Sequence, residues 1–352
     1  MRKLLILLFF FLVILTIFEF FNGFWFKPQI EKNLLYLNAL YDIDIQIDSN
    51  DYYPSRHKTS YIRNKYGLRT DCKNMQDIDL VVMGGSTTDQ RYIDFENTFS
   101  YLLQEKLSYK SESNFCIANA GVDGHKLLSH IYTLENWFPL IPSFNPVYYL
   151  LNIGINDVVP NGNVISKNSF INSLYSRIKF TIIRNSYLYS FFKKIHNLIG
   201  INTNRYGVLT HKKGIKNDFK YTAVKRSNEF KDDIIENSIR FGKNFNNAIN
   251  LIKSRGSKPI CITQKTLFTK KGKGISKAFP YKNNYLNGLD LQYSLDLINS
   301  QIKRICSNEG AIIIDVENTS FEENDFYDFV HHNPQGSRKL ADKIFTIIKD
   351  QF

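Results

Sequence analysis

The chain has 352 residues, 43% of them hydrophobic, and a formal net charge of +12, which suits one large domain or two modest ones. Its four cysteines are too few and too dispersed for a disulfide scaffold, and no Cys-x-x-Cys pair suggests a zinc site. Cys116 and Cys261 lie inside apolar runs that resemble strands, so we expect them to be buried free thiols.

The N-terminus is strongly apolar. Two basic residues precede an uncharged apolar run over 4–18, which Glu19 ends. Such a run is either a cleaved signal peptide or an uncleaved membrane anchor, and a buried helix of a soluble protein is a third interpretation. Small residues of the A-x-A kind are missing at its end, which favours the anchor. With Glu19 at the interface the span extends to Phe26. The basic flank places the rest of the chain outside the cytoplasm, and cleavage would secrete it.

A polar lead-in rich in Tyr and Asn occupies residues 27–76, and the stretch 64–69 within it gives a turn signal. Strands and helices alternate after it. Strands are expected over 78–83, 115–118, 147–153, 259–263 and 311–316, and helices over 96–108, 125–138, 228–254, 286–307 and 335–349. This alternation implies right-handed crossovers and a mostly parallel sheet that is covered on both faces. Ligands of such sheets bind at the carboxyl ends of the strands.

A basic insertion, residues 160–226, interrupts this alternation. It holds thirteen Lys or Arg and one acid, Asp218, a balance of +12 that equals the net charge of the whole chain. Apolar residues recur over 170–199 at near-helical spacing, which suits a segment that lies on an anionic membrane or caps the active site. A solvated insertion packed by its aromatic residues is the alternative. We expect no nucleic-acid partner, because the domain is expected outside the cytoplasm.

Four short motifs carry the residue types that ester chemistry needs. They are Gly84-Gly85-Ser86-Thr87-Thr88, Asn119-Ala120-Gly121-Val122-Asp123-Gly124, Gly154-Ile155-Asn156-Asp157 and Asp328-Phe329-Val330-His331. Three of them directly follow expected strands, and the fourth lies in the loop before the last helix. All four can therefore reach the same edge of the sheet. They supply a nucleophile, oxyanion donors, and a base with its orienting acid.

The first three motifs suit a nucleophile and an oxyanion hole. Ser86 follows two glycines that permit a tight turn, and the next residues can begin a helix whose free amides favour negative charge. A phosphate-binding loop or a plain helix cap is the alternative, and the missing lysine disfavours the former. Gly124 allows a backbone N–H to approach a substrate oxygen, and the Asn156 amide can complete the hole. A turn and a helix cap are the structural alternatives for these two.

The last motif suits a general base. Asp328 and His331 are three residues apart, so in a helical turn both side chains face one way. His331 can then accept the Ser86 proton while a carboxylate orients its ring. The neighbouring candidates for these roles are Asp315, Asp325 and His332. No third strong ligand is spaced to make a zinc site, so no metal is predicted.

Taken together, the four motifs resemble those of the SGNH hydrolase superfamily, also called GDSL-type esterases and lipases. Gly85 replaces the aspartate of the family's first block, at a position that does not carry the chemistry. The glycine of the second block falls on Gly124. The Gly-x-Asn-Asp block is matched by 154–157 and the Asp-x-x-His block by 328–331. The resemblance extends over about residues 62–350, apart from most of the basic insertion.

The resemblance implies a flavodoxin-like three-layer α/β/α sandwich with a central parallel sheet. It also implies that Ser86 attacks an ester carbonyl while His331 shuttles the proton and Asp328 orients His331. The oxyanion donors it implies are the backbone N–H groups of Ser86 and Gly124 and the side-chain amide of Asn156. An acyl-enzyme would form on Ser86 and be released by water, without a cofactor.

We therefore expect a transmembrane anchor or signal peptide over 1–26, a lead-in over 27–76, and a hydrolase domain over 77–352 that carries the basic insertion. The predicted function is a serine esterase that removes O-acyl groups, with O-acetyl groups on envelope or extracellular carbohydrate as the expected substrate. The alternatives are an acyltransferase to a sugar, a lipid-directed esterase and a non-catalytic membrane-tethered protein. The membrane is an expected partner, through the N-terminal helix and the basic insertion.

Overall fold

A parallel sheet forms the centre of the computed structural model, which describes residues 2–23, 25–49, 57–160, 185–189, 221–227, 229–270, 277–278 and 286–351. Its five strands are β3 (Leu80–Gly84), β4 (Ile117–Asn119), β5 (Tyr148–Asn152), β7 (Lys258–Ile262) and β10 (Ile312–Ile314). Their spatial order is β10-β7-β5-β3-β4. Because β4 lies on one side of β3 and β5 on the other, the connections diverge at the carboxyl end of β3. Doubly wound sheets bind ligands at such a switch point.

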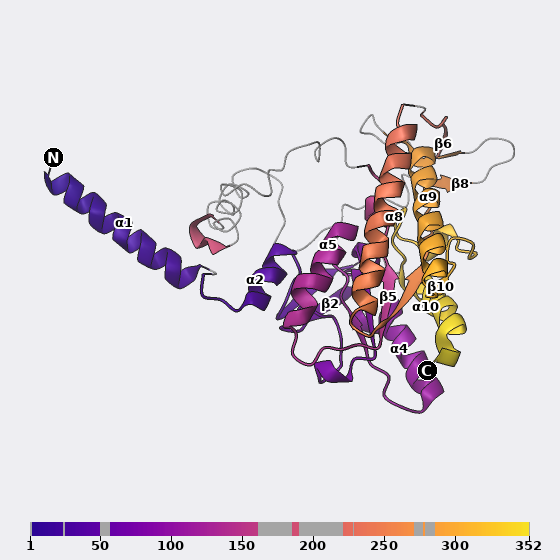
Figure 1. Ribbon diagram of the computed structural model, residues 1–352, viewed down its shortest axis with the longest axis horizontal. Helices are drawn as coiled ribbons and strands as arrows, with labels where there is room; N and C mark the ends of the chain where they lie inside the picture. Colours follow the sequence, from indigo (N-terminus) through magenta and orange to yellow (C-terminus); the bar gives the residue numbers. More distant parts are fainter. Residues whose placement is uncertain are drawn as a thin grey trace.

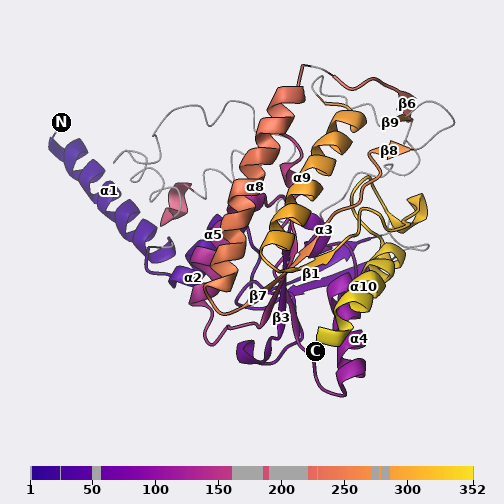
Figure 2. The same cartoon turned by 45° about the vertical axis from the view of Figure 1, so that its right-hand side comes forward.

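Helices cover both faces of this sheet, which confirms the predicted three-layer α/β/α sandwich (Figures 1 and 2). One face carries α5 (Leu127–Tyr132), α8 (Lys231–Lys253) and α9 (Gly288–Asn308), and the other carries α4 (Phe99–Ser111) and α10 (Pro334–Ile348). The alternating side chains of β3 divide between two cores: Val81 and Met83 pack with α8 and α9, and Leu80 and Val82 with α4 and α10.

The expected helix over 125–138 is interrupted. Helix α5 ends at Tyr132 and continues as a π turn over Thr133–Trp137 and a 3-10 turn over Phe138–Leu140. Trp137 is fully buried there, and its indole N–H donates to the Tyr66 carbonyl at 2.8 Å. The wider turn thus goes together with an aromatic anchor between this helix and the lead-in.

The lead-in has more regular structure than its polar composition indicates. It contains helix α2 (Gln29–Tyr36) and an antiparallel pair, β1 (Ile43–Asp48) and β2 (Lys58–Arg63). Beyond β2 the lead-in joins the core, because the backbones of Arg69 and Asn119 exchange two hydrogen bonds of 2.9 and 3.0 Å. A further small sheet of β6 (Thr222–Ala223), β9 (Lys277–Ala278) and β8 (Thr269–Lys270) lies apart from the main one.

Both cysteines that we expected to be free thiols form disulfides, so that expectation was wrong. Cys116 pairs with Cys72, and Cys261 pairs with Cys306. Their Cα atoms lie 6.0 and 6.5 Å apart, within the usual range for a disulfide. The spacing of 44 and 45 residues in the sequence hid this proximity, which the lead-in creates in one case and helix α9 in the other.

Helix α1 (Arg2–Asn22) extends away from the body of the molecule (Figure 1). It is long and apolar enough to cross a membrane, with a mean hydropathy of 3.0 over its most apolar window. The Glu19 carboxylate near its end accepts hydrogen bonds from the backbone N–H groups of Tyr187 and Leu188, at 3.0 and 2.8 Å. The helix expected over 170–199 lies outside the described residues, apart from 185–189.

Candidate active site

The sequence motifs meet at the carboxyl edge of the sheet. Ser86 begins the short helix α3 (Ser86–Asp89) directly after β3 and Gly85. Gly124 lies in the loop after β4, and Asn156 lies in a 3-10 turn (Ile155–Asp157) after β5. The first and third motifs therefore flank the switch point of the sheet. His331 approaches from the loop before α10.

A continuous chain of hydrogen bonds joins three of the predicted residues. The Ser86 Oγ lies 2.7 Å from Nε2 of His331, although the two residues are 245 positions apart. Nδ1 of His331 lies 2.5 Å from Oδ2 of Asp328. An ionised carboxylate only accepts, so Nδ1 carries the proton and Nε2 is left to accept from the serine hydroxyl. This arrangement suits proton transfer from Ser86 to His331.

Asp328 is held in its ionised form by its surroundings. Burial raises its pKa, but the adjacent His331 and the backbone N–H groups of Val330 and His331 outweigh burial and hold the pKa below its usual value. Those two N–H groups donate to the second carboxylate oxygen at 2.8 and 2.7 Å. The loop is therefore a turn built on the aspartate rather than the helical turn that we considered. The ring of Tyr327 stacks on His331 with an interplanar angle of 2°.

The neighbouring candidates lie elsewhere. His332 is buried between Phe321 and Phe326, with ring centroids 4.7 and 4.5 Å away, and neither ring nitrogen has a hydrogen-bond partner among the described residues. The carboxylate of Asp325 accepts from the Lys339 ammonium at 2.8 Å. Asp315 accepts from the Asn318 side chain at 2.7 Å. The structure thus distinguishes His331 from His332, and Asp328 from the other two aspartates.

Asn156 stands directly beside the nucleophile turn. A Cβ atom placed on Gly85 would lie 2.3 Å from Nδ2 of Asn156, so a larger residue at this position would require the amide to move. The amide donates to the carbonyl of His125 at 2.9 Å, which fixes its orientation. One amide hydrogen remains for a substrate oxygen. Gly85, which departs from the aspartate of the family's first block, thus lies directly beside a predicted oxyanion donor.

The backbone at Gly124 requires glycine for its conformation. Its φ of +73° lies in the left-handed region, and a Cβ there would meet nothing within 4 Å. Glycine is therefore required here by the backbone conformation and not by close neighbours, because the space around a Cβ atom is open. The next residue, His125, donates from Nε2 to the carbonyl of Leu37 in the lead-in at 2.6 Å. Burial lowers the pKa of His125, which keeps the ring neutral for this bond.

Asp157 has a different role from its neighbour Asn156. Its carboxylate accepts from the backbone N–H of Leu127 at 3.1 and 3.2 Å, at the start of helix α5. Burial raises the pKa of this carboxyl to about 6. Its backbone carbonyl accepts from the Asn237 side chain in α8 at 2.7 Å. The third motif therefore anchors the helix that follows the second motif.

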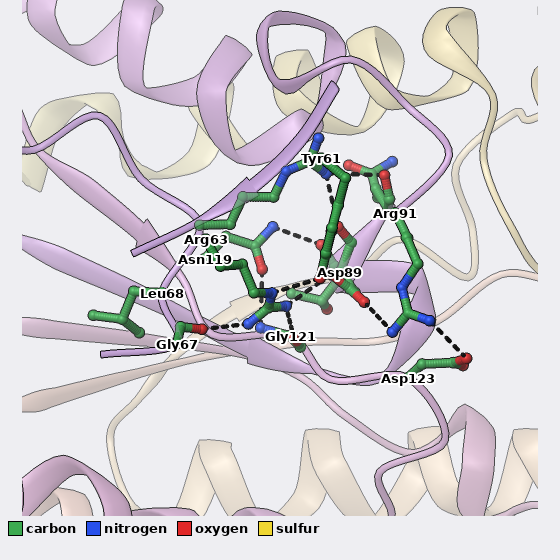
Figure 3. A network of polar contacts seen from close by, with 12 residues as sticks. Tyr61, Arg63, Gly67, Leu68, Asp89, Arg91, Asn119, Gly121 and Asp123 are labelled. Carbon is green, nitrogen blue, oxygen red and sulfur yellow. Dashed lines mark hydrogen bonds and ion pairs between the residues drawn. The ribbon is translucent and has the colours of Figure 1, made fainter. Parts of the chain in front are cut away.

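A buried network of charged residues meets at Asp89, in the short helix that Ser86 begins (Figure 3). Asp89, the last residue of α3, accepts from Arg63 at 2.7 Å, from the Tyr61 hydroxyl at 2.8 Å and from Arg91 at 3.2 Å. This network was not predicted from the sequence, because Tyr61 and Arg63 lie in the lead-in and nothing local links them to Ser86. The Gly-Leu-Arg turn that ends at Arg69 was the one available signal. Among the described residues, no group of three or more His, Cys, Asp or Glu is arranged to hold a metal ion.

No protein-family model and no curated protein matches the sequence. Several solved structures are similar to it. A member of the lipolytic protein G-D-S-L family from Veillonella parvula is 16% identical, with a TM-score of 0.43 over 77% of this chain and 97% of that one. An acetylxylan esterase from Geobacillus stearothermophilus is 13% identical, with a TM-score of 0.43 over 76% and 93%. An alpha/beta hydrolase enzyme from the metagenome of Lake Arreo in Spain is 13% identical, with a TM-score of 0.42 over 78% and 97%.

Proposed function

We propose that the chain is a serine esterase that hydrolyses O-acyl esters through Ser86, His331 and Asp328. The main support for this proposal is the continuous hydrogen-bonded path from the Ser86 hydroxyl through His331 to the Asp328 carboxylate. In this mechanism Ser86 Oγ attacks the ester carbonyl as its proton moves to Nε2 of His331. The backbone N–H groups of Ser86 and Gly124 and the Asn156 amide then stabilise the oxyanion.

The acyl-enzyme on Ser86 is released by water, which His331 deprotonates in turn. We propose O-acetyl groups on envelope or extracellular carbohydrate as the substrate, on the resemblance of the motifs to SGNH hydrolases. Transfer of the same acyl group to a sugar hydroxyl shares the first step. Products formed with an acetylated sugar in water separate the two reactions, since hydrolysis releases free acetate and transfer yields a newly acetylated acceptor.

The direct test compares acetyl-ester hydrolysis by the purified chain with that of Ser86→Ala and His331→Gln. Each variant is expected to lose about 10³-fold or more in kcat, because the nucleophile and base act as a unit. The matched controls are Ser300→Ala, on the exposed face of α9, and His332→Phe. Both are expected to retain activity, and a Ser86→Ala variant as active as its control would refute the proposal.

We further propose that α1 remains in the protein as a membrane anchor, with the catalytic domain outside the cytoplasm. Two observations support this placement. The contacts of Glu19 with Tyr187 and Leu188 would be lost if α1 were removed as a signal peptide. Two disulfides suit an oxidising compartment rather than the cytoplasm. Retention of the full-length mass in the membrane fraction, with protease access from outside, tests the placement.

A further inference from the structure

The buried side chain of Arg63 joins three segments around the proposed site (Figure 3). Its guanidinium donates to the Asp89 carboxylate at 2.7 Å and to the carbonyl oxygens of Gly67 and Gly121. Asp89 ends the helix that Ser86 begins, and Gly121 lies in the loop that leads to the proposed oxyanion glycine. One side chain of the lead-in therefore contacts both the nucleophile helix and the oxyanion loop.

This contact depends on the shape of the arginine side chain. The planar guanidinium presents five N–H donors in a fixed fork, so it can hold several acceptors at set positions, which a lysine ammonium on a flexible stem does not. The Arg63 side chain is 1% exposed, as is that of Asp89. A buried charge of this kind is costly without a full set of partners. Burial raises the pKa of Asp89, but Arg63 and Arg91 outweigh it and keep the carboxylate ionised.

A second buried arginine of the lead-in supports the same helix. Arg69 donates to the carbonyls of Asp89 and Gln90 at 3.0 and 2.9 Å, and to that of Ile93 at 2.6 Å. Gln90 has a left-handed backbone, with φ of +46°, where the chain leaves α3. Arg69 thus fixes the exit from the helix, whereas Arg63 connects its end to the neighbouring loop.

Helix α3 and the loop around Gly121 are closely packed against each other. A Cβ atom on Gly121 would lie 2.4 Å from the backbone nitrogen of Asp89. The Asn119 side chain, two residues before Gly121, donates to the carbonyl of Thr88 at 2.6 Å. The oxyanion loop and α3 are therefore in direct contact, and Arg63 hydrogen bonds to both of them.

We propose that Arg63 is a positioning residue of the active site, which sets the distance between the Ser86 hydroxyl and the oxyanion loop. The inference rests on the proposed esterase function. It makes the lead-in a working part of the catalytic centre rather than a spacer between membrane and enzyme. A displacement of reacting groups by about 1 Å can cost about 10²-fold in rate, so a small shift of α3 against the loop has a large effect.

The test is Arg63→Lys in the full chain, with kcat and KM for p-nitrophenyl acetate and the midpoint of thermal unfolding as readouts. Lysine keeps a positive charge near Asp89 but does not reproduce the fork that reaches Gly121. We expect kcat to fall about 10- to 100-fold and KM to change less than about threefold. A purely structural role would lower the unfolding midpoint and leave kcat of the folded protein unchanged.

Leu107→Ala is the matched control for stability. Leu107 is buried in α4 near the end of that helix, away from the carboxyl edge of the sheet. Its truncation is expected to cost about 2–5 kcal/mol of stability without a change in kcat. Arg63→Lys with wild-type kcat would overturn the proposal, whatever its unfolding midpoint.

If Arg63→Lys does not fold, the variant Tyr61→Phe tests the same proposal. The Tyr61 hydroxyl accepts from Nε of Arg63 and donates to Asp89, so its removal loosens the same contact with little change of volume. A few-fold lower kcat at constant KM supports the proposal, and an unchanged kcat overturns it. Ser86→Ala is measured in parallel. If Ser86→Ala is inactive and Arg63→Lys keeps the wild-type kcat, only the role of Arg63 is refuted. If Ser86→Ala is active, the esterase function itself is refuted.

Discussion

Asp328 and His331 are held by contacts within their own loop, whereas the end of the helix that Ser86 begins is held by residues from the distant lead-in. On the first side, one carboxylate accepts two N–H groups of its own turn and the imidazole of the same turn. On the second side, Arg63 reaches the end of α3 across 26 residues of sequence and the oxyanion loop across 58. The proposed base is thus held by local contacts, and the proposed nucleophile site depends on tertiary ones.

This difference predicts how substitutions in each of the two regions affect activity and stability. A local turn keeps its shape when distant parts of the molecule change, so damage to it should remove chemistry and spare the fold. The nucleophile side depends on buried charges that are paired across segments, so damage there should affect stability and rate together. Four predictions follow from it.

The largest expected effect is that of Asp328→Asn. The amide lacks the second acceptor oxygen that receives Nδ1–H of His331 and favours the wrong tautomer, so we expect kcat to fall about 10⁴-fold. The unfolding midpoint should change little, because the turn retains an acceptor for its N–H groups. Asp315→Asn, at a nearby carboxylate that does not contact His331, is the control. Ester hydrolysis by both variants is the measurement, and equal activities would contradict the assignment of Asp328.

Removal of the two disulfides is expected to lower stability equally but to change kcat in one case only. Replacement of Cys72 and Cys116 by serine opens a loop of 44 residues, and replacement of Cys261 and Cys306 opens one of 45. Chain entropy predicts a loss of about 4 kcal/mol for either pair. We expect only the first pair to lower kcat as well, since it ties the lead-in to the sheet. Urea unfolding and ester hydrolysis are the measurements, and equal kcat values would contradict the dependence of the nucleophile side on the lead-in.

His125 links the oxyanion donors to the lead-in, and its replacement should have a smaller effect. Loss of the Nε2 donor to Leu37 in His125→Leu frees the backbone that holds the Asn156 amide, so we expect a fall in kcat of about 10-fold. His125→Gln places an amide N–H near the same position and should restore most of the rate. If both variants lose equal activity, the hydrogen bond to Leu37 is not the cause.

His332 gives the smallest effect, and it concerns stability alone. Burial is the main cause that lowers its pKa, to about 4 from the ordinary 6.5. The unfolded chain therefore takes up a proton at this residue below pH 6.5 that the folded protein does not take up until about pH 4, and stability falls as the pH drops through that window. The loss is about 2 kcal/mol between pH 7 and pH 5.

The variant His332→Phe removes this proton uptake and suits the aromatic surroundings of Phe321 and Phe326. Unfolding by urea at pH 7 and pH 5 measures the difference. The variant should lose about 2 kcal/mol less than the wild type over this range. An identical loss in both proteins would show that His332 does not titrate in this way.

The division between local and tertiary contacts also explains what the sequence could predict. The strand-helix alternation, the parallel sheet and the carboxyl-edge location of the motifs follow from apolar periodicity, which is a local property. The spacing of Asp328 and His331 predicted a pair on one loop, although the loop is an aspartate turn rather than a helical one. The family resemblance placed the base at His331 rather than His332, and in the structure Nε2 of His331 lies 2.7 Å from the Ser86 hydroxyl.

Contacts of the lead-in with the core could not be predicted from the sequence. The hairpin of β1 and β2 and its buried arginines looked like part of a polar lead-in, because a charged residue is usually exposed and nothing nearby signals its partner. Cys116 and Cys261 looked like buried free thiols, because their partners Cys72 and Cys306 are 44 and 45 residues away in the sequence. Gly85 appeared only as a departure from a family pattern, and its close approach to the Asn156 amide emerged with the structure.

If α1 is the proposed membrane anchor, its connection to α2 limits the distance between the proposed catalytic domain and the bilayer. Only six residues, 23–28, separate the end of α1 from the start of α2. Fully extended, they span about 20 Å. With α1 in the membrane, this short connection would keep the proposed esterase domain close to the lipid headgroups. Acylated polymers deep in a cell envelope would then be out of range, and newly made chains still near the membrane would be within reach.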